Sequence, residues 1–321
     1  MRYTRLGSSR LDVSPLCLGT MNFGRHASAD DSFEIMDAAH AAGINYFDTA
    51  NSYSTPDHPG ISEEIIGEWF AKGGQRREKT VLATKLFEDT DPWPNNGGLS
   101  ALNIRRACDA SLSRLGTDYI DVLQMHHVDR GARWEEIWEA YEVLRAQGKF
   151  LYAGSSNFAG WHLAVAQNAA EKRNFFGLVS EQSVYNLAER TIELEVLPAA
   201  QHLGIGVVVW SPLSGGLLTE PTAGTTGRRA SAEFVERASR YTDQLAGTRA
   251  IASDLGATLS QVALAWLLTR PGIVAPIIGP RTLEQLTSLL PAADLTLGDA
   301  ALAELDRLWP GPGAAPEAYA W

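Results

Sequence analysis

A short apolar segment, a polar loop and an amphipathic helix follow one another eight times from residue 15 onward. The apolar segments are residues 16–19, 44–48, 81–85, 119–126, 150–154, 178–184, 207–210 and 273–278. Strands that alternate with helices predict a parallel sheet, because each crossover helix returns the chain to the same end of the sheet. Eight such units in 321 residues predict an α/β fold, one (β/α)₈ TIM barrel, with residues 1–321 as a single domain.

The alternative for this pattern is a doubly wound open sheet. A dinucleotide-binding sheet of that kind has a Gly-rich turn after its first strand, and no G-x-G-x-x-G occurs in this chain. Gly204-Ile205-Gly206 opens a strand instead of a helix, so it does not supply that turn. The barrel is therefore favoured.

Turn and capping residues predict where several strands and helices begin or end. Residues 1–14 alternate around Gly7-Ser8-Ser9 and predict a β-hairpin before the first unit. Asp30 and Ser100 are candidate N-caps of the helices that follow the first and third strands. Two helical stretches are expected near 233–255 and 259–269, after a loop over residues 212–232.

Composition excludes several classes of partner. A net charge of -11 and a pI of about 5.1 argue against binding to nucleic acid, which needs a basic face. Cys17 and Cys108 lie in apolar periodic stretches without metal-ligand spacing, so we expect buried thiols and no metal site. The chain lacks a signal-peptide pattern and an apolar run long enough to cross a membrane, which predicts a cytoplasmic protein without a membrane partner.

Chemically complementary residues lie where three successive strands end. Asp48 and Lys85 close the second and third strands, and His126 closes the fourth. Tyr53 follows Asp48 by five residues, across a polar turn. The carboxyl ends of barrel strands share one face, so these four side chains are expected to converge there.

Convergence of these groups suggests proton donation to a carbonyl. A tyrosine with a pKa of about 10 is a poor acid near neutrality, and an adjacent ammonium lowers that pKa. Lys85 is the available cation, Asp48 would hold it charged, and His126 would donate a hydrogen bond or help to move the proton. The electrons must come from an external donor, because no nucleophile–base pair or metal site accompanies the set.

The neighbouring His127 competes with His126 for that role. Side chains alternate across a strand, so the two imidazoles should point to opposite faces. For His127 a pocket wall and a packed histidine both stay open. Trp210 ends a strand and could be barrel packing.

Taken together, these residues give the chain a resemblance to the aldo-keto reductase family over essentially its whole length. The matching motifs are Asp48-Thr49-Ala50-x-x-Tyr53, Ala83-Thr84-Lys85, Asp121-x4-His126, Gly154-x-Ser156-Asn157-Phe158 and Trp210-Ser211-Pro212-Leu213. The resemblance implies a barrel closed at its bottom by the N-terminal hairpin, and NADPH-dependent reduction of an aldehyde or ketone. It implies Tyr53 as general acid, tuned by Lys85 and Asp48, with His126 orienting the carbonyl.

The resemblance also implies contacts to NADPH (NADP⁺). Those to the carboxamide, the nicotinamide face and the phosphate bridge fall on Ser156, Asn157, Gln182, Trp210, Ser211, Leu213 and Gly215. Gly279 and Arg281 match the family's loop after the eighth strand, where an Arg meets the 2′-phosphate, and Gln285 would reach the ribose-phosphate end. The family's Glu-Asn pair at the adenine is replaced by Thr287-Ser288-Leu289.

The substrate is a small carbonyl compound whose identity the sequence leaves open. Candidate pocket residues are Phe23, Phe87, Trp93 and His127, and Tyr319 and Trp321 are candidates to fold over the site. Two other functions stay open: a cofactor-sensing subunit with little turnover, and NAD-dependent oxidation of an alcohol. The oligomeric state has no signature in the sequence.

Overall fold

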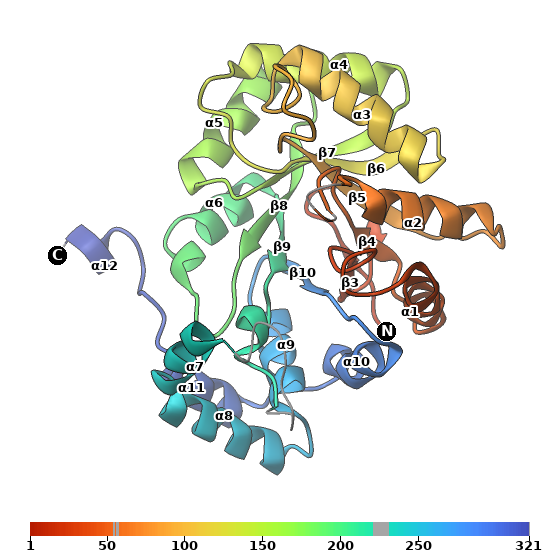
Figure 1. The fold of residues 1–321 in the computed structure, drawn as a ribbon. Coiled ribbons are helices and arrows are strands. Elements are labelled where there is room, and N and C mark those ends of the chain that lie inside the picture. The colour runs from red at the N-terminus through yellow and green to blue at the C-terminus, as the bar shows by residue number, and fades with distance from the viewer. Residues whose placement is uncertain (54, 56–57, 221–230, 321) are drawn as a thin grey trace.

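A computed structural model describes residues 1–53, 55, 58–220 and 231–320 of the chain. Eight parallel strands close into a barrel in the order β10-β3-β4-β5-β6-β7-β8-β9 (Figure 1). Their bounds are β3 Cys17–Gly19, β4 Tyr46–Asp48, β5 Val81–Leu86, β6 Ile120–Met125, β7 Phe150–Ser156, β8 Leu178–Val184, β9 Gly206–Trp210 and β10 Ile273–Ile278. The predicted (β/α)₈ barrel is confirmed.

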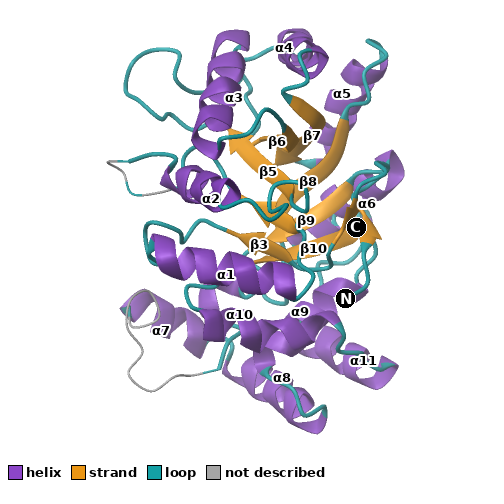
Figure 2. Ribbon diagram, turned by 90° about the vertical axis from the view of Figure 1, so that its right-hand side faces the viewer, coloured by secondary structure: helices purple, strands orange, loops and turns teal. Residues whose placement is uncertain are grey.

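Helices surround the strands, as Figure 2 shows. The first six are α1 Ala29–Ala41, α2 Ile61–Ala71, α3 Ala101–Leu115, α4 Trp134–Ala146, α5 Gly160–Glu171 and α6 Val196–Leu203. The others are α7 Ala232–Ser239, α8 Thr242–Asp254, α9 Leu259–Thr269, α10 Leu283–Leu289, α11 Asp299–Leu308 and α12 Glu317–Ala320. The short 3₁₀ turns within the described residues are η1 Thr191–Glu193, η2 Ser214–Gly216 and η4 Leu290–Ala293.

The predicted hairpin is present and lies at the amino-terminal end of the barrel. Strands β1 Thr4–Arg5 and β2 Asp12–Val13 pair antiparallel. The turn between them docks on the start of β9, where Ser8 N donates to Gly204 O at 2.7 Å. Gly7 has φ +59°, and a Cβ there would lie 2.7 Å from the backbone nitrogen of Gly206, so the turn needs glycine.

Two local expectations were wrong. The N-cap of α1 is Ser28 and not Asp30, because Ser28 accepts from Asp31 N while the Asp31 side chain reaches back to the cap in a capping box. The helical stretch expected over 233–255 is two helices, α7 and α8, which a turn at Arg240 and Tyr241 separates. Ser100 caps α3 as expected.

The core has two parts. One fills the barrel near the hairpin, where Leu6 and Val13 pack with Cys17, Tyr46 and other buried strand residues. The larger part lies between the strands and the helices and includes nearly the whole of α9, which explains the apolar sequence of that helix. Among the described residues no single helix is long and apolar enough to cross a membrane. Helices α8 and α9 reach that length and hydropathy only when taken together, and an 89° bend separates them.

Candidate active site

Four predicted residues come together at the carboxyl ends of three neighbouring strands. Asp48 is the last residue of β4, Lys85 is the penultimate residue of β5, and His126 follows β6 directly. Strands β4, β5 and β6 pair in that order, so their ends adjoin. Tyr53 reaches the same place from the loop after β4.

Lys85 lies at the centre of the group. Its Nζ donates to Asp48 Oδ2 at 2.7 Å and to the Tyr53 hydroxyl at 2.8 Å. A third hydrogen bond goes to the carbonyl oxygen of Thr49 at 2.9 Å. The ammonium therefore uses all three donors, and one of them is directed at the phenol oxygen.

Two glutamines hold the other oxygen of Asp48. The amide nitrogens of Gln124 and Gln182 lie 3.2 and 2.7 Å from Asp48 Oδ1. Gln182 was predicted as a cofactor contact, and its amide nitrogen here donates to the carboxylate. Gln124 was missed; the available signal was a polar side chain among the apolar residues at the end of β6, two residues before His126. Both amides keep Asp48 turned toward Lys85 without adding charge.

Burial changes the acid–base properties of this group. Burial raises the pKa of Tyr53 above its usual value, and Lys85 opposes that rise without cancelling it. Lys85 thus acts on the pKa of Tyr53 in the expected direction, but burial is the larger effect and sets the net direction upward. Burial also acts to lower the pKa of Lys85, but Asp48 and Tyr53 outweigh it and the pKa is raised. A proton on Tyr53 and a charge on Lys85 are the result.

His126 packs edge-on against Tyr53, with ring centroids 5.8 Å apart and planes at 76°. Burial, together with the charge of Lys85, lowers the pKa of His126 to about 3. The imidazole is therefore neutral near pH 7. His127 lies against Phe87, with ring centroids 5.6 Å apart, so the two adjacent histidines have different neighbours.

Two of the predicted cofactor residues lie beside this group, Ser156 at the end of β7 and Asn157 in the turn that follows. Asn157 has φ +61° and bridges the site, since its Nδ2 donates to His126 O at 3.1 Å and its Oδ1 accepts from Trp210 Nε1 at 3.1 Å. Ser156 Oγ donates to Gln182 O at 2.9 Å. Trp210, at the end of β9, keeps 36% of its surface exposed. A flat ligand can lie against that exposed indole.

The chain after Trp210 folds into a tight loop of left-handed residues. Ser211, Ser214 and Gly215 have φ of 51°, 52° and 64°. Asn186 Nδ2 donates to Ser211 O at 3.0 Å, and Arg237 of α7 donates to the hydroxyl and carbonyl of Ser214. Leu213 packs against the core. Asn186 and Arg237 were missed because only the folded chain brings them to this loop.

The remaining predicted cofactor residues lie after β10. Gly279 accepts a hydrogen bond from Asn22 Nδ2 at 2.8 Å, which ties this loop to the one after β3. Arg281 is exposed, and its backbone nitrogen donates to Gln285 Oε1 at 2.8 Å. Gln285 is therefore engaged at the start of α10, and the Arg281 guanidinium faces solvent.

The candidate substrate residues differ in exposure. Phe23 was expected to wall the pocket, but it is fully buried in the core cluster and lines no open surface. Phe87 is half-buried beside His127, and Trp93 is 75% exposed on the loop after β5. The Tyr319 hydroxyl donates to Glu195 Oε1 at 3.2 Å, ahead of α6, and Figure 1 shows α12 away from the barrel. Trp321 lies outside the described residues.

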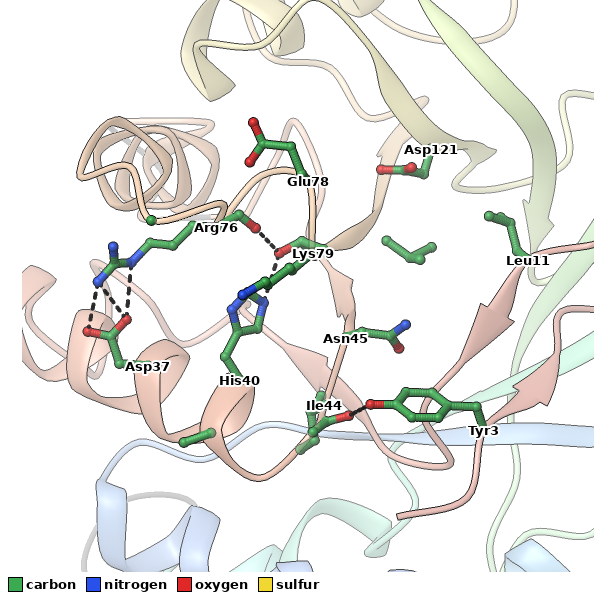
Figure 3. Close-up of a pocket in the computed structure, with 15 residues that line it drawn as sticks. Tyr3, Leu11, Asp37, His40, Ile44, Asn45, Arg76, Glu78, Lys79 and Asp121 are labelled. Carbon is green, nitrogen blue, oxygen red and sulfur yellow. Dashed lines mark hydrogen bonds and ion pairs between the residues drawn. The ribbon is translucent and has the colours of Figure 1, made fainter.

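A surface hollow of about 770 Å³ lies at the opposite end of the barrel, near the hairpin (Figure 3). Several of its polar groups are paired with one another: Asp37 with Arg76 at 3.1 Å, His40 with Thr80 at 3.0 Å, and Tyr3 with Gly43 O at 2.9 Å. None of the four convergent residues lines it. The candidate active site is therefore the group of four residues at the carboxyl ends of the strands.

Comparison with known proteins agrees with this geometry. A model of the Aldo/keto reductase family matches residues 15–310. The chain is 51% identical, over all of both chains, to the uncharacterized oxidoreductase YrpG of Bacillus subtilis (strain 168). It is 35% identical to the aldo-keto reductase AMT2 of Alternaria alternata, covering 92% of this chain and 88% of that one. It is 32% identical to a probable voltage-gated potassium channel subunit beta of Arabidopsis thaliana, covering 99% and 100%. A family match along most of the chain and relatives that align over nearly their full length show that this protein belongs to the aldo/keto reductase family.

Proposed function

We propose that this protein reduces an aldehyde or ketone to an alcohol with NADPH, and that Tyr53 is the general acid. The observation that carries the proposal is the position of Lys85, whose ammonium lies within hydrogen-bond distance of both the Tyr53 hydroxyl and Asp48. A proton donor with an adjacent fixed cation suits a reaction in which negative charge develops on a carbonyl oxygen.

The residues around the site fit a nicotinamide cofactor. Trp210 offers an exposed ring, and Ser156 and Asn157 lie beside it. Gly215 and Gly216 have no side chains, so the backbone of the loop after Trp210 stays open to a phosphate. The exposed guanidinium of Arg281 suits a 2′-phosphate. When bound, NADPH supplies the hydride that goes to the carbonyl carbon.

Residues of the chain transfer the proton and stabilise the charge that the transfer leaves behind. The Tyr53 hydroxyl gives its proton to the carbonyl oxygen as that oxygen gains charge. The phenolate left behind lies 2.8 Å from Lys85 Nζ, which stabilises it until solvent returns a proton. Asp48, held by Gln124 and Gln182, keeps the ammonium charged and directed at Tyr53. His126 is neutral and can only donate a hydrogen bond to the same oxygen.

NADPH consumption by the purified protein, with nitrobenzaldehyde and several ketones, tests the proposal. Tyr53→Phe removes the acid and keeps the ring, so we expect it to lower kcat by about 10²–10⁴-fold, with NADPH binding retained. Binding is measured separately by fluorescence titration. Equal turnover by the wild type and Tyr53→Phe would contradict the role of Tyr53.

A second function is a cofactor-sensing subunit with little turnover. The resemblance to a probable potassium channel subunit beta is the observation that favours it. The two proposals differ in one result, because a sensing subunit would bind NADPH and reduce none of the carbonyls. NAD-dependent alcohol oxidation is a third, and it requires tighter binding of NAD⁺ than of NADP⁺ in the same titration.

A further inference from the structure

Glu181 is a fully buried carboxyl group that the proposed mechanism does not use. It lies in β8, directly before Gln182, and adjoins Ser155 in the neighbouring strand β7. Side chains alternate along a strand, so Glu181 points away from the barrel interior, where Gln182 meets Asp48. On that side it meets the turn that follows β7, which begins after Ser156 with Asn157.

The carboxyl group is surrounded by hydrogen-bond donors. Its Oε1 accepts from Phe158 N at 3.0 Å and from Ser183 Oγ at 2.8 Å. Its Oε2 accepts from Ser155 Oγ. Two of these partners, Ser155 and Phe158, flank Ser156 and Asn157 in the sequence. Glu181 therefore accepts hydrogen bonds from the residue directly before and the residue directly after the two predicted cofactor residues.

The turn has one residue in the left-handed region, where asparagine is better tolerated than most side chains. Asn157 has φ +61°, a region that L-residues visit at a cost. From that conformation its amide joins the backbone oxygen of His126 to the indole of Trp210. Asn157 N also donates to Gln182 O at 2.9 Å and Ser156 Oγ to the same oxygen, so the amino side of the turn has a second support. Releasing Phe158 N would loosen the carboxyl side of the turn, and with it the bridge between the loop after β6 and the ring at the end of β9.

We propose that Glu181 is a positioning residue for the cofactor site: through Ser155 and Phe158 it holds Asn157 in the conformation that joins His126 to Trp210. This inference rests on the proposed function in so far as the site takes NADPH. It predicts that the loss of Glu181 weakens NADPH binding more than it slows the chemical step.

The neutral analogue of the side chain should serve almost as well. Burial raises the pKa of Glu181 to about 7, so the protonated form is available near neutrality. A glutamine keeps an acceptor for Phe158 N, and its amide nitrogen can donate to Ser155, whose hydroxyl also accepts. A methionine has similar length and leaves the Phe158 N–H without an acceptor.

The test compares Glu181→Met, Glu181→Gln and a matched control, Asp121→Asn. Asp121 is also a buried carboxylate that accepts from a backbone N–H, that of Leu82, but it lies at the amino-terminal end of β6. We expect the Kd for NADPH to rise about tenfold in Glu181→Met, which corresponds to 1.4 kcal/mol, and to change by less than about threefold in Glu181→Gln and Asp121→Asn. With saturating NADPH, kcat of Glu181→Met should stay within about threefold of the wild-type value.

Hydrogen exchange of the free protein supplies a readout that does not need turnover. Backbone amides of residues 155–159 should exchange faster in Glu181→Met, and those of the hairpin at residues 4–13 should not. If Glu181→Met does not fold, Glu181→Asp takes its place, because it withdraws the carboxylate from Phe158 by one methylene and should shift both readouts in the same direction.

The outcomes separate the two proposals. An unchanged Kd and unchanged exchange in Glu181→Met would overturn the role of Glu181, as would equal losses in Asp121→Asn. If the wild type itself does not bind NADPH, the proposed function fails, and the exchange experiment alone then decides whether Glu181 holds the turn.

Discussion

The ammonium of Lys85 lies 2.7 Å from the carboxylate of Asp48, with 0% and 3% of the two side chains exposed. Such a pair is held where water cannot screen either charge, so each partner depends on the other. The same ammonium lies 2.8 Å from the Tyr53 hydroxyl, which makes the pair part of the proposed catalytic group as well as of the barrel interior.

Asp48→Asn should destabilise the protein by about 3–5 kcal/mol, because it leaves the Lys85 ammonium buried without a counter-charge. Urea unfolding of the two proteins measures the difference. Glu236→Gln is the control, since Glu236 and Arg240 form an ion pair whose side chains are 70% and 69% exposed. Such a surface pair should contribute little. Equal losses in both variants would show that burial of the Asp48–Lys85 pair is not the cause.

His126→Gln should lower kcat/KM by about tenfold without changing how kcat/KM depends on pH between 5 and 8. The pKa of His126 is about 3, so the imidazole is already neutral over this range and acts only as a donor. Gln keeps a donor and cannot titrate. An inflection near pH 6 that is present in the wild type and absent from His126→Gln would contradict a neutral imidazole.

His40 should make the protein less stable as the pH falls from 6.5 toward 4. Burial lowers the pKa of His40 to about 4, so the unfolded chain takes up a proton first, and the stabilisation present above pH 6.5 is lost through that window. We expect a loss of about 1–2 kcal/mol, less than the full shift implies, because the ring is only part-buried. Unfolding curves of the wild type and His40→Gln at pH 7 and pH 4.5 measure it. Parallel losses in both proteins would exclude His40 as the cause.

Arg281→Ala should raise the Kd for NADPH by about tenfold or more and leave that for NADH nearly unchanged, because the guanidinium is expected to meet only the 2′-phosphate. Fluorescence titration with both nucleotides gives the ratio. Arg307→Ala, at an exposed arginine of α11 that pairs with Glu304, is the control for a general loss of positive charge. If both Kd values rise together, Arg281 does not select the phosphate.

Much of this site was readable from local sequence. Asp48, Lys85 and His126 were identified because each ends an apolar segment, and the closed barrel brings those ends to one face. The expected N-cap at Asp30 failed because Ser28 and Asp31 together satisfy more backbone groups than Asp30 alone. Phe23 was placed in the pocket by its position after a strand, and packing against the core decided otherwise.

The sequence by itself determined the order of strands and helices, the barrel they form and the residues at the strand ends, because hydrophobic period and capping signals act over a few residues. Only the tertiary structure decided which partners hold those residues. Gln124 and Gln182 meet Asp48 across 76 and 134 positions of sequence, and Glu181 accepts from Phe158 N in the turn after the neighbouring strand. The raised pKa of Tyr53 is likewise a property of the folded barrel, since burial outweighs the nearby Lys85 only once the surrounding loops exclude water.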